Sequence, residues 1–190
     1  MNCTGLRPFA RNGAGGKVVA VLFLLISPVL TQGVQSHDEW VKYTSKEGRY
    51  SVLVPSQPTV DSQEATSAGG DKFIQYKASV IGAGVVYMIG YFDYSPGTSF
   101  TFDKARDGMI DAVKGILLSE QSINLGGAPG RELRLSTKDS SGAEYLMLAR
   151  FYDVDRRVYV LQFITAKSSE TEFERRANRY FDSFQVVKTP

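Results

Sequence analysis

The chain has 190 residues, with 22 lysine and arginine side chains, 20 aspartate and glutamate side chains, one histidine and one cysteine. A hydrophobic content of 43% is enough for a packed core and excludes an intrinsically disordered chain. The aromatic content of 12% favours β structure, because aromatic side chains fit a pleated, half-buried surface.

The first 36 residues have the pattern of a secretory signal peptide. Residues 1–17 carry three basic side chains and no acidic one, and residues 18–30 (VVAVLFLLISPVL) are apolar. This apolar run is shorter than the roughly 20 residues that a membrane-spanning helix needs. We therefore predict a periplasmic or secreted protein that is cleaved between Ser36 and His37. Cleavage after Gly33 and an uncleaved membrane anchor at residues 18–30 are the alternatives.

Loss of the leader would change the charge and the cysteine content. Subtracting its three basic residues from 22 leaves 19 against 20 acidic residues, a net charge of −1, so we expect no nucleic-acid partner. Cys3 also lies in the leader, which excludes disulfides and thiolate catalysis in the remainder. Residues 37–190 contain no repeat or low-complexity linker and are expected to form one domain, with no cofactor and no metal ion. Contact with a membrane is expected only through an uncleaved N-terminal segment.

The first half of this domain should contain hairpins and one helix. Strand-like runs are separated by glycine-containing turns, and proline ends regular pairing after the second run. Helical spacing of apolar residues then predicts a helix that Thr101 caps. In chain order, we predict strands at 40–44 and 49–55, a polar connection at 59–70, strands at 72–80 and 85–94, and a helix at 102–118.

The second half should contain four strands and a closing helix. Strands are predicted at 120–125, 130–137, 143–152 and 157–165. The last two are apolar on both faces, so they need cover on both sides of the sheet. An amphipathic helix at 169–183 supplies part of that cover, with Phe173, Ala177, Tyr180, Phe181 and Phe184 as its buried stripe. The predicted fold class is α+β, an antiparallel β-sheet sandwiched between helices.

The stretch NLGGAPGRELRL, residues 124–135, has the composition of a ligand-binding loop. Phosphate-binding loops place their glycines before a helix, whose N-terminal amides hold the anion. Here the following residues alternate as in a strand, with Leu133 and Leu135 on one face and Glu132 and Arg134 on the other. We therefore interpret Gly126-Gly127 and Pro129-Gly130 as turn dipeptides and the stretch as a hairpin.

Few residues offer catalytic chemistry. His37 stands at the predicted mature N-terminus, and the absence of any other histidine excludes the usual serine and cysteine triads. Asp153 and Asp155 form the nearest candidate carboxylate pair, but their position between two strands favours a turn. An aromatic group could line a binding face, although core packing is the favoured interpretation. It consists of Tyr87, Tyr91, Phe92 and Tyr94.

Four stretches together resemble exported bacterial proteins of the PsbP-like type. They are YTSKEGRYSVLVPSQP (43–58), LGGAPGREL (125–133), RFYDVDRRVYVLQ (150–162) and RYFDSFQV (179–186). The resemblance implies the α/β/α sandwich that this type shares with a Ran-binding nuclear import factor. It also implies a non-enzymatic binding or assembly role. No photosystem-binding or Ran-binding residue of those proteins has a match here.

We therefore expect an exported, non-enzymatic binding or assembly module. Its partner would be an envelope protein or a small ligand that the sequence does not specify. Two alternatives remain: a carboxylate-based, metal-independent hydrolase and a membrane-anchored structural protein of the envelope.

Overall fold

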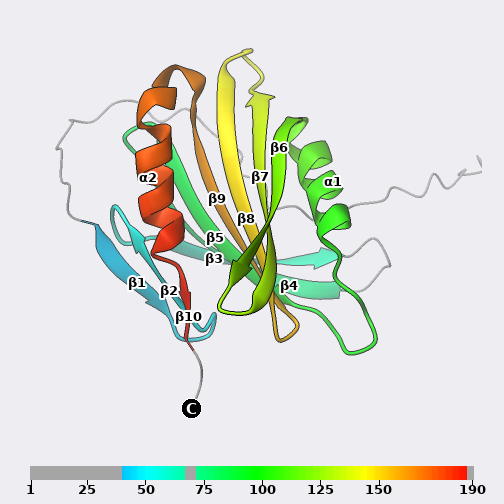
Figure 1. Ribbon diagram of the computed structural model, residues 1–190. Helices are drawn as coiled ribbons and strands as arrows, with labels where there is room; N and C mark the ends of the chain where they lie inside the picture. Colours follow the sequence, from blue (N-terminus) through cyan, green and yellow to red (C-terminus); the bar gives the residue numbers. More distant parts are fainter. Residues whose placement is uncertain (1–39, 67–71, 188–190) are drawn as a thin grey trace, which may run out of the picture.

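The computed structural model describes residues 40–66 and 72–187, without the side chains of 169–173. Within these residues, seven strands form a larger antiparallel sheet in the order β3-β4-β5-β9-β8-β7-β6 (Figure 1). Their bounds are β3 Thr59–Thr66, β4 Lys72–Gly82, β5 Val85–Asp93, β6 Ile116–Leu125, β7 Ala128–Lys138, β8 Glu144–Val154 and β9 Arg157–Ala166. A smaller antiparallel sheet consists of β1 Val41–Ser45, β2 Tyr50–Val54 and β10 Gln185–Val186.

Both faces of the larger sheet are covered, as the apolar strands predict. Helix α2 (Glu170–Asp182) and the smaller sheet pack on one face, and α1 (Phe102–Val113) packs on the other (Figure 1). The first core contains the α2 side chains Ala177, Tyr180 and Phe181, all at most 2% exposed. The second joins Met109 of α1 to strands β7, β8 and β9. An α+β fold with its sheet between helices is therefore confirmed, but the predicted stripe residue Phe173 lies outside the described side chains.

Side chains of β9 attach the smaller sheet to the larger one. The hydroxyl of Tyr159 donates to the carbonyl of Gly48 at 2.8 Å, and Arg157 Nη1 donates to the carbonyl of Glu47 at 2.7 Å. Arg157 also forms two hydrogen bonds with the carboxylate of Asp93, at 2.6 and 2.7 Å. The guanidinium lies 4.6 Å from the centre of the Tyr91 ring. Buried and half-buried polar groups therefore set the β1–β2 turn against the end of the sheet.

The first helix is shorter than predicted. It ends at Val113 because Lys114 adopts a left-handed conformation with φ of 49°, and β6 begins at Ile116. The apolar residues at 116 and 117 continue the helical spacing, so periodicity alone could not locate this end. Thr101 precedes the helix as predicted, but its side chain makes no capping hydrogen bond.

The predicted polar connection at 59–70 is also partly wrong. Residues 59–66 form β3, which pairs with β4 along its whole length, and residues 67–70 lie outside the described part. β3 is an edge strand, and seven of its eight residues are exposed. A strand in water on both faces needs no apolar alternation, so the pattern used to find strands was missing.

The predicted leader, residues 1–36, and its cleavage site at Ser36 and His37 lie outside the described residues. Among the described helices, none is both long enough and apolar enough to cross a membrane.

Candidate functional site

The glycine-rich stretch forms the β6–β7 hairpin, as predicted. Gly126 and Gly127 are the two loop residues, with φ values of 58° and 98°. Glycine favours this turn because it adopts positive φ without steric cost. The backbone N–H of Gly127 donates to the side-chain oxygen of Asn124 at 2.8 Å. No helix follows the loop, so its amides close a turn and are not presented to a phosphate.

The prediction that Pro129-Gly130 is a second turn is wrong. Both residues lie inside β7, and Gly130 pairs with Tyr152 of β8. A Cβ atom at Gly130 would lie 2.6 Å from the carbonyl oxygen of Phe151 and 2.6 Å from the Tyr152 ring. This glycine therefore permits close packing in the sheet.

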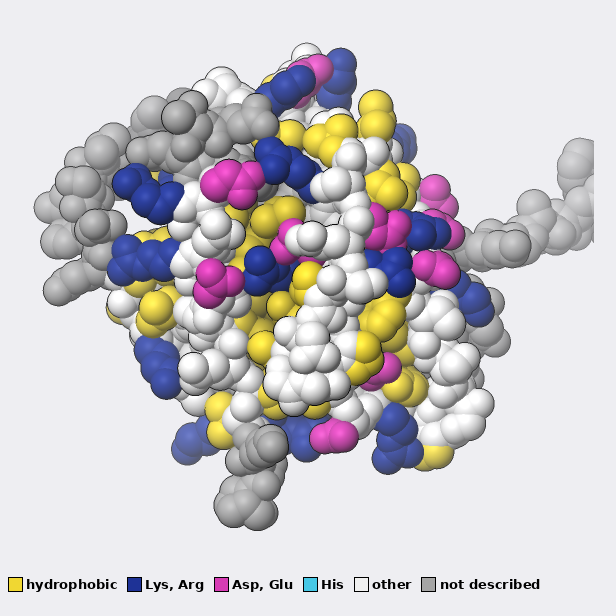
Figure 2. Space-filling model, in the orientation of Figure 1, with side chains coloured by type: hydrophobic (Ala, Val, Ile, Leu, Met, Phe, Trp, Pro, Cys, Tyr) yellow, Lys and Arg dark blue, Asp and Glu magenta, His cyan; other side chains and the backbone are white. Residues whose placement is uncertain are grey.

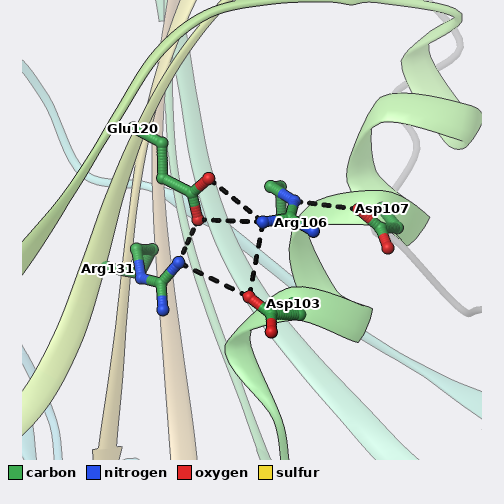
Figure 3. Close-up of polar contacts among 5 residues, drawn as sticks. All are labelled: Asp103, Arg106, Asp107, Glu120 and Arg131. Atoms are coloured by element: carbon green, nitrogen blue, oxygen red, sulfur yellow. Dashed lines mark hydrogen bonds and ion pairs between the residues drawn. The ribbon is translucent and has the colours of Figure 1, made fainter.

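Arg131 belongs to a group that we call the α1 charged cluster (Figure 3). It consists of Asp103, Arg106 and Asp107 of α1, Glu120 of β6 and Arg131 of β7. Arg131 pairs with Glu120, and its Nη1 lies 3.6 Å from an oxygen of Asp103. Arg106 Nη1 lies 3.1 Å from Glu120, and its Nε lies 2.8 Å from Asp107. Two arginines face three carboxylates, so both guanidinium groups are paired and the cluster ties α1 to the hairpin. The Nε atom of Arg131 is nevertheless buried without a hydrogen-bond partner among the described residues.

Glu132 and Arg134 point to the opposite face, as the strand pattern predicts. Glu132 accepts a hydrogen bond from Arg150 at 2.6 Å, and Arg134 pairs with Glu174 of α2 at 2.6 Å. Arg150 also pairs with Asp182 at 3.2 Å. Figure 2 shows charged side chains of both signs between α2 and the β6–β7 hairpin. All the charged residues of the glycine-rich stretch therefore contribute to fixing the two helices on the sheet.

The β8–β9 connection is a turn, as predicted. Asp155 and Arg156 have positive φ values of 50° and 63°. Asp153 ends up in β8, where its carboxylate accepts a hydrogen bond from the hydroxyl of Tyr94. The two aspartates thus have separate structural environments.

The four aromatic residues at 87–94 pack as predicted. Tyr87 and Tyr91 lie in the core under α2, and Phe92 and Tyr94 pack against the core under α1. Tyr87 makes an edge-on contact with Tyr180, with ring centres 5.4 Å apart.

Gln162 of β9 is a polar residue that the sequence analysis passed over. Its strand neighbours Val160 and Ile164 belong to, or pack against, the core under α1, so Gln162 points to the α1 side of the sheet. The residue is 1% exposed, and its Nε2 has no hydrogen-bond partner among the described residues. A buried donor without a partner costs about 1–3 kcal/mol. Native proteins seldom keep such a group without a use for it.

Strand β6 is a second feature with groups that the described structure leaves unpaired. It is an edge of the larger sheet, and two neighbouring positions are strongly exposed: Ile116 at 68% and Leu118 at 51%. Figure 2 shows hydrophobic side chains at the surface near the start of this strand. The one charged residue of β6 is Glu120, which the α1 charged cluster neutralises. The outer edge of β6 therefore combines unpaired backbone groups with neutral side chains.

Each described carboxyl group with a clear pKa shift has a pKa below its ordinary value. The hydrogen bonds from Arg157 lower the pKa of Asp93. Burial raises the pKa of Glu120, but hydrogen bonds from Arg131 and Arg106 outweigh this effect and lower it overall. The pKa values of Asp139 and Glu144 are also lowered, mainly by hydrogen bonds from Ser141 and from Lys167. Over residues 40–66 and 72–187, no group of three histidine, cysteine, aspartate or glutamate side chains is placed to hold a metal ion.

Comparison of the structure with solved structures identifies the fold. The solution structure of cyanobacterial PsbP from Synechocystis sp. PCC 6803 aligns with a TM-score of 0.58 at 14% sequence identity. The alignment covers 85% of this chain and 100% of the PsbP chain. The fold is PsbP-like. At this identity the likeness establishes the architecture and leaves the function open.

Two further solved structures align with lower scores. A protein of unknown function from Pseudomonas aeruginosa has a TM-score of 0.45 and 15% identity, covering 80% of this chain and 98% of its own. LpqN, which is involved in cell envelope biogenesis of Mycobacterium tuberculosis, has a TM-score of 0.41 and 11% identity, covering 73% of this chain and 91% of its own. No family model and no curated protein matches the chain.

The sequence analysis missed both features, the unpartnered amide of Gln162 and the exposed edge of β6. The signal for Gln162 was present, because it is the one strongly polar residue in the apolar run VYVLQFI. The signal for β6 was absent, since its first two residues fit the preceding helix equally well.

Proposed function

We propose that this chain is an exported, non-enzymatic binding module that accepts an extended segment of a partner protein along β6. Export rests on the leader-like pattern of residues 1–36. Binding rests on one observation, the neutral and partly apolar edge of β6. An edge strand offers unpaired N–H and C=O groups, which an added strand can satisfy.

The opposite edge of the sheet supports this choice by contrast. β3 carries Asp61 and Glu64, which pair with Lys77 and Lys72 but remain 59% and 58% exposed, whereas Glu120 of β6 is 20% exposed. Exposed charged side chains are a common protection against unwanted strand pairing. β6 has no such outward charge, although a bulge between Leu117 and Ser119 interrupts its beginning. The regular part after the bulge, residues 119–125, is long enough for several ladder hydrogen bonds. This contrast favours β6 over β3 as the edge strand that pairs with a segment of a partner protein.

The two alternative functions have less support. A general acid at neutral pH needs a raised pKa, whereas each described carboxyl group with a clear shift has a lowered one. This favours binding over a carboxylate-based, metal-independent hydrolase. A membrane-anchored structural protein would depend on residues 18–30, which are outside the described part.

Site-specific photo-crosslinking in the native envelope tests the proposal. A crosslinking amino acid at Ser122 on β6 should yield a discrete protein adduct, and the same group at Ser62 on β3 should not. Substituting both Ile116 and Leu118 with aspartate should abolish the adduct and leave the unfolding midpoint almost unchanged, because exposed side chains contribute little to stability. Equal adducts from both edges, or none from β6, would contradict the proposal. An adduct of twice the chain mass would identify a second copy in place of a different partner.

A further inference from the structure

The α1 side of the larger sheet carries three rows of side chains across β4, β5 and β9. The strand register defines each row. Ile81, Val86 and Ile164 lie side by side in the first, Ser79, Met88 and Gln162 in the second, and Lys77, Gly90 and Val160 in the third. Neighbouring rows are about 7 Å apart along the strands, which is two residues of extended chain. The rows therefore change from apolar to cationic over about 14 Å. Ile81 at one end is 68% exposed and the Lys77 side chain at the other is 18% exposed, whereas Met88 and Gln162 in the middle row are 1% exposed.

Gln162 lacks an acceptor in its own neighbourhood. Its partners across the strands are Met88 and Ala149, which have no oxygen in their side chains. The hydroxyl-bearing Ser79 of the same row lies beyond Met88, two strands and about 10 Å away between backbones. Lys77 in the next row is a donor only. The amide oxygen of Gln75, also on this side, already accepts a hydrogen bond from Gln63 at 3.1 Å. The amide of Gln162 is thus suited to donate to an oxygen brought by a ligand.

Lys77 supplies a positive charge beside this amide. Gly90 lies between Lys77 and Val160 and has no side chain, so no side chain separates Lys77 from Val160, which is two residues from Gln162 on the same face of β9. The lysine side chain is 18% exposed and pairs with Asp61 at 3.4 Å, a partner that is itself 59% exposed. An ion pair with such an exposed partner is weak. The ammonium can therefore turn from Asp61 to an anionic group without a large loss.

The row beyond Gln162 suits an apolar group. Ile81 is 68% exposed on this side, whereas Val86 next to it is 8% exposed. Exposure thus increases from β5 toward β4, which makes β4 the side from which a ligand would approach. A tail laid over Ile81 would remove apolar surface from water.

We infer that this side of the sheet binds an amphiphile with one anionic head and one apolar tail. The head accepts hydrogen bonds from Gln162 Nε2 and Lys77 Nζ, and the tail covers Ile81 and Val86. Carboxylate and phosphate heads share this chemistry. The site is separate from the β6 edge, so it stands whether or not the proposed partner protein binds there.

Calorimetric titration of the purified full-length mature protein with dodecanoate and with dodecyl phosphate tests the site and distinguishes the two heads. Saturable binding of at least one of them is expected, and dodecyltrimethylammonium, with the same tail and a cationic head, should not bind. Gln162→Leu and Lys77→Met should each weaken binding at least tenfold. Lys72→Met is the matched control, because Lys72 lies on the same strand, points to the other face and pairs with Glu64. It should bind as the parent does.

Thermal unfolding of Gln162→Leu provides a second readout. Removal of an unpartnered buried amide should raise the midpoint while binding falls, a combination that a purely structural residue would not give. A raised midpoint with unchanged binding would show that Gln162 is only an unpaired core group and would overturn the inference. Absence of saturable binding by both anionic probes, or equal binding of the cationic probe, would overturn it as well.

Discussion

The close contact at Gly130 allows a stability prediction that separates packing from backbone strain. In Gly130→Ala, the new Cβ would lie 2.6 Å from the Phe151 carbonyl oxygen and 2.6 Å from the Tyr152 ring. Optimal non-bonded carbon contacts are about 3.5–4.0 Å, so both strands must move. Overpacking of this kind costs about 1–3 kcal/mol. Alanine also lowers the conformational entropy of the unfolded chain, which offsets about 0.4–1 kcal/mol of this loss in stability.

With the middle value of each range, a cost of about 2 kcal/mol less a gain of about 0.7 kcal/mol, the expected net loss for Gly130→Ala is about 1.3 kcal/mol, which corresponds to a melting temperature lower by roughly 3–5 °C. Urea unfolding followed by tryptophan fluorescence measures the change in free energy, and thermal unfolding followed by circular dichroism measures the change in melting temperature.

Two other glycines serve as controls. Gly82→Ala should be neutral or slightly stabilising, because a Cβ there meets nothing within 4 Å and the residue has no positive φ. Gly127→Ala also meets nothing within 4 Å but has φ of 98°, so it should lose about 1–2 kcal/mol from backbone strain alone. Equal stability of Gly130→Ala and the parent would refute the close approach of β7 and β8.

Three further predictions follow from the core, the ion pairs and the leader. Phe181→Ala should cost about 3–5 kcal/mol in chemical unfolding, because this side chain of α2 is 2% exposed; a loss below about 1 kcal/mol would mean that α2 is not an integral layer. Asp93 has a lowered pKa, so its ion pair with Arg157 contributes stability above the ordinary value of 3.8 and loses it as the pH falls through the lower folded value. Asp93→Asn should therefore be less stable than the parent at pH 7 by only about 0.5–1 kcal/mol, because Asp93 is 60% exposed and solvent screens the pair, and this difference should shrink toward pH 2; a constant difference would contradict the assignment. N-terminal sequencing of protein from the envelope should begin at His37, and an intact Met1 on cytoplasmic protein would contradict export.

Local sequence patterns were sufficient to predict the strands and the helix whose apolar side chains recur at a regular spacing, and the turn with two adjacent glycines. The two faces of β8 and β9, the turn at Gly126-Gly127 and the buried stripe of α2 follow from side-chain periodicity and from glycine's access to positive φ, which are properties of neighbouring residues. From them, the two-sided cover of the sheet and the α+β class could be deduced.

Local patterns failed where long-range pairing supplied the stabilisation. The exposed strand β3 forms because β4 offers it a ladder of hydrogen bonds, and the chain leaves the helix at Lys114 so that Ile116 can begin β6 beside β7. The local sequence of β3 or of β6 does not show which strand it will pair with.

The candidate sites depended on the tertiary structure even more strongly. Arg131 could have served a ligand until the fold placed it against Glu120 and Asp103, and Gln162 became notable only when its neighbours proved to lack an acceptor. The composition of a segment specifies which groups it carries, but only the packing of distant segments decides which of those groups are already satisfied. Hydrogen bonds and ion pairs across the sheet are formed between residues far apart in the chain, and for that reason the unsatisfied ones could not be identified beforehand.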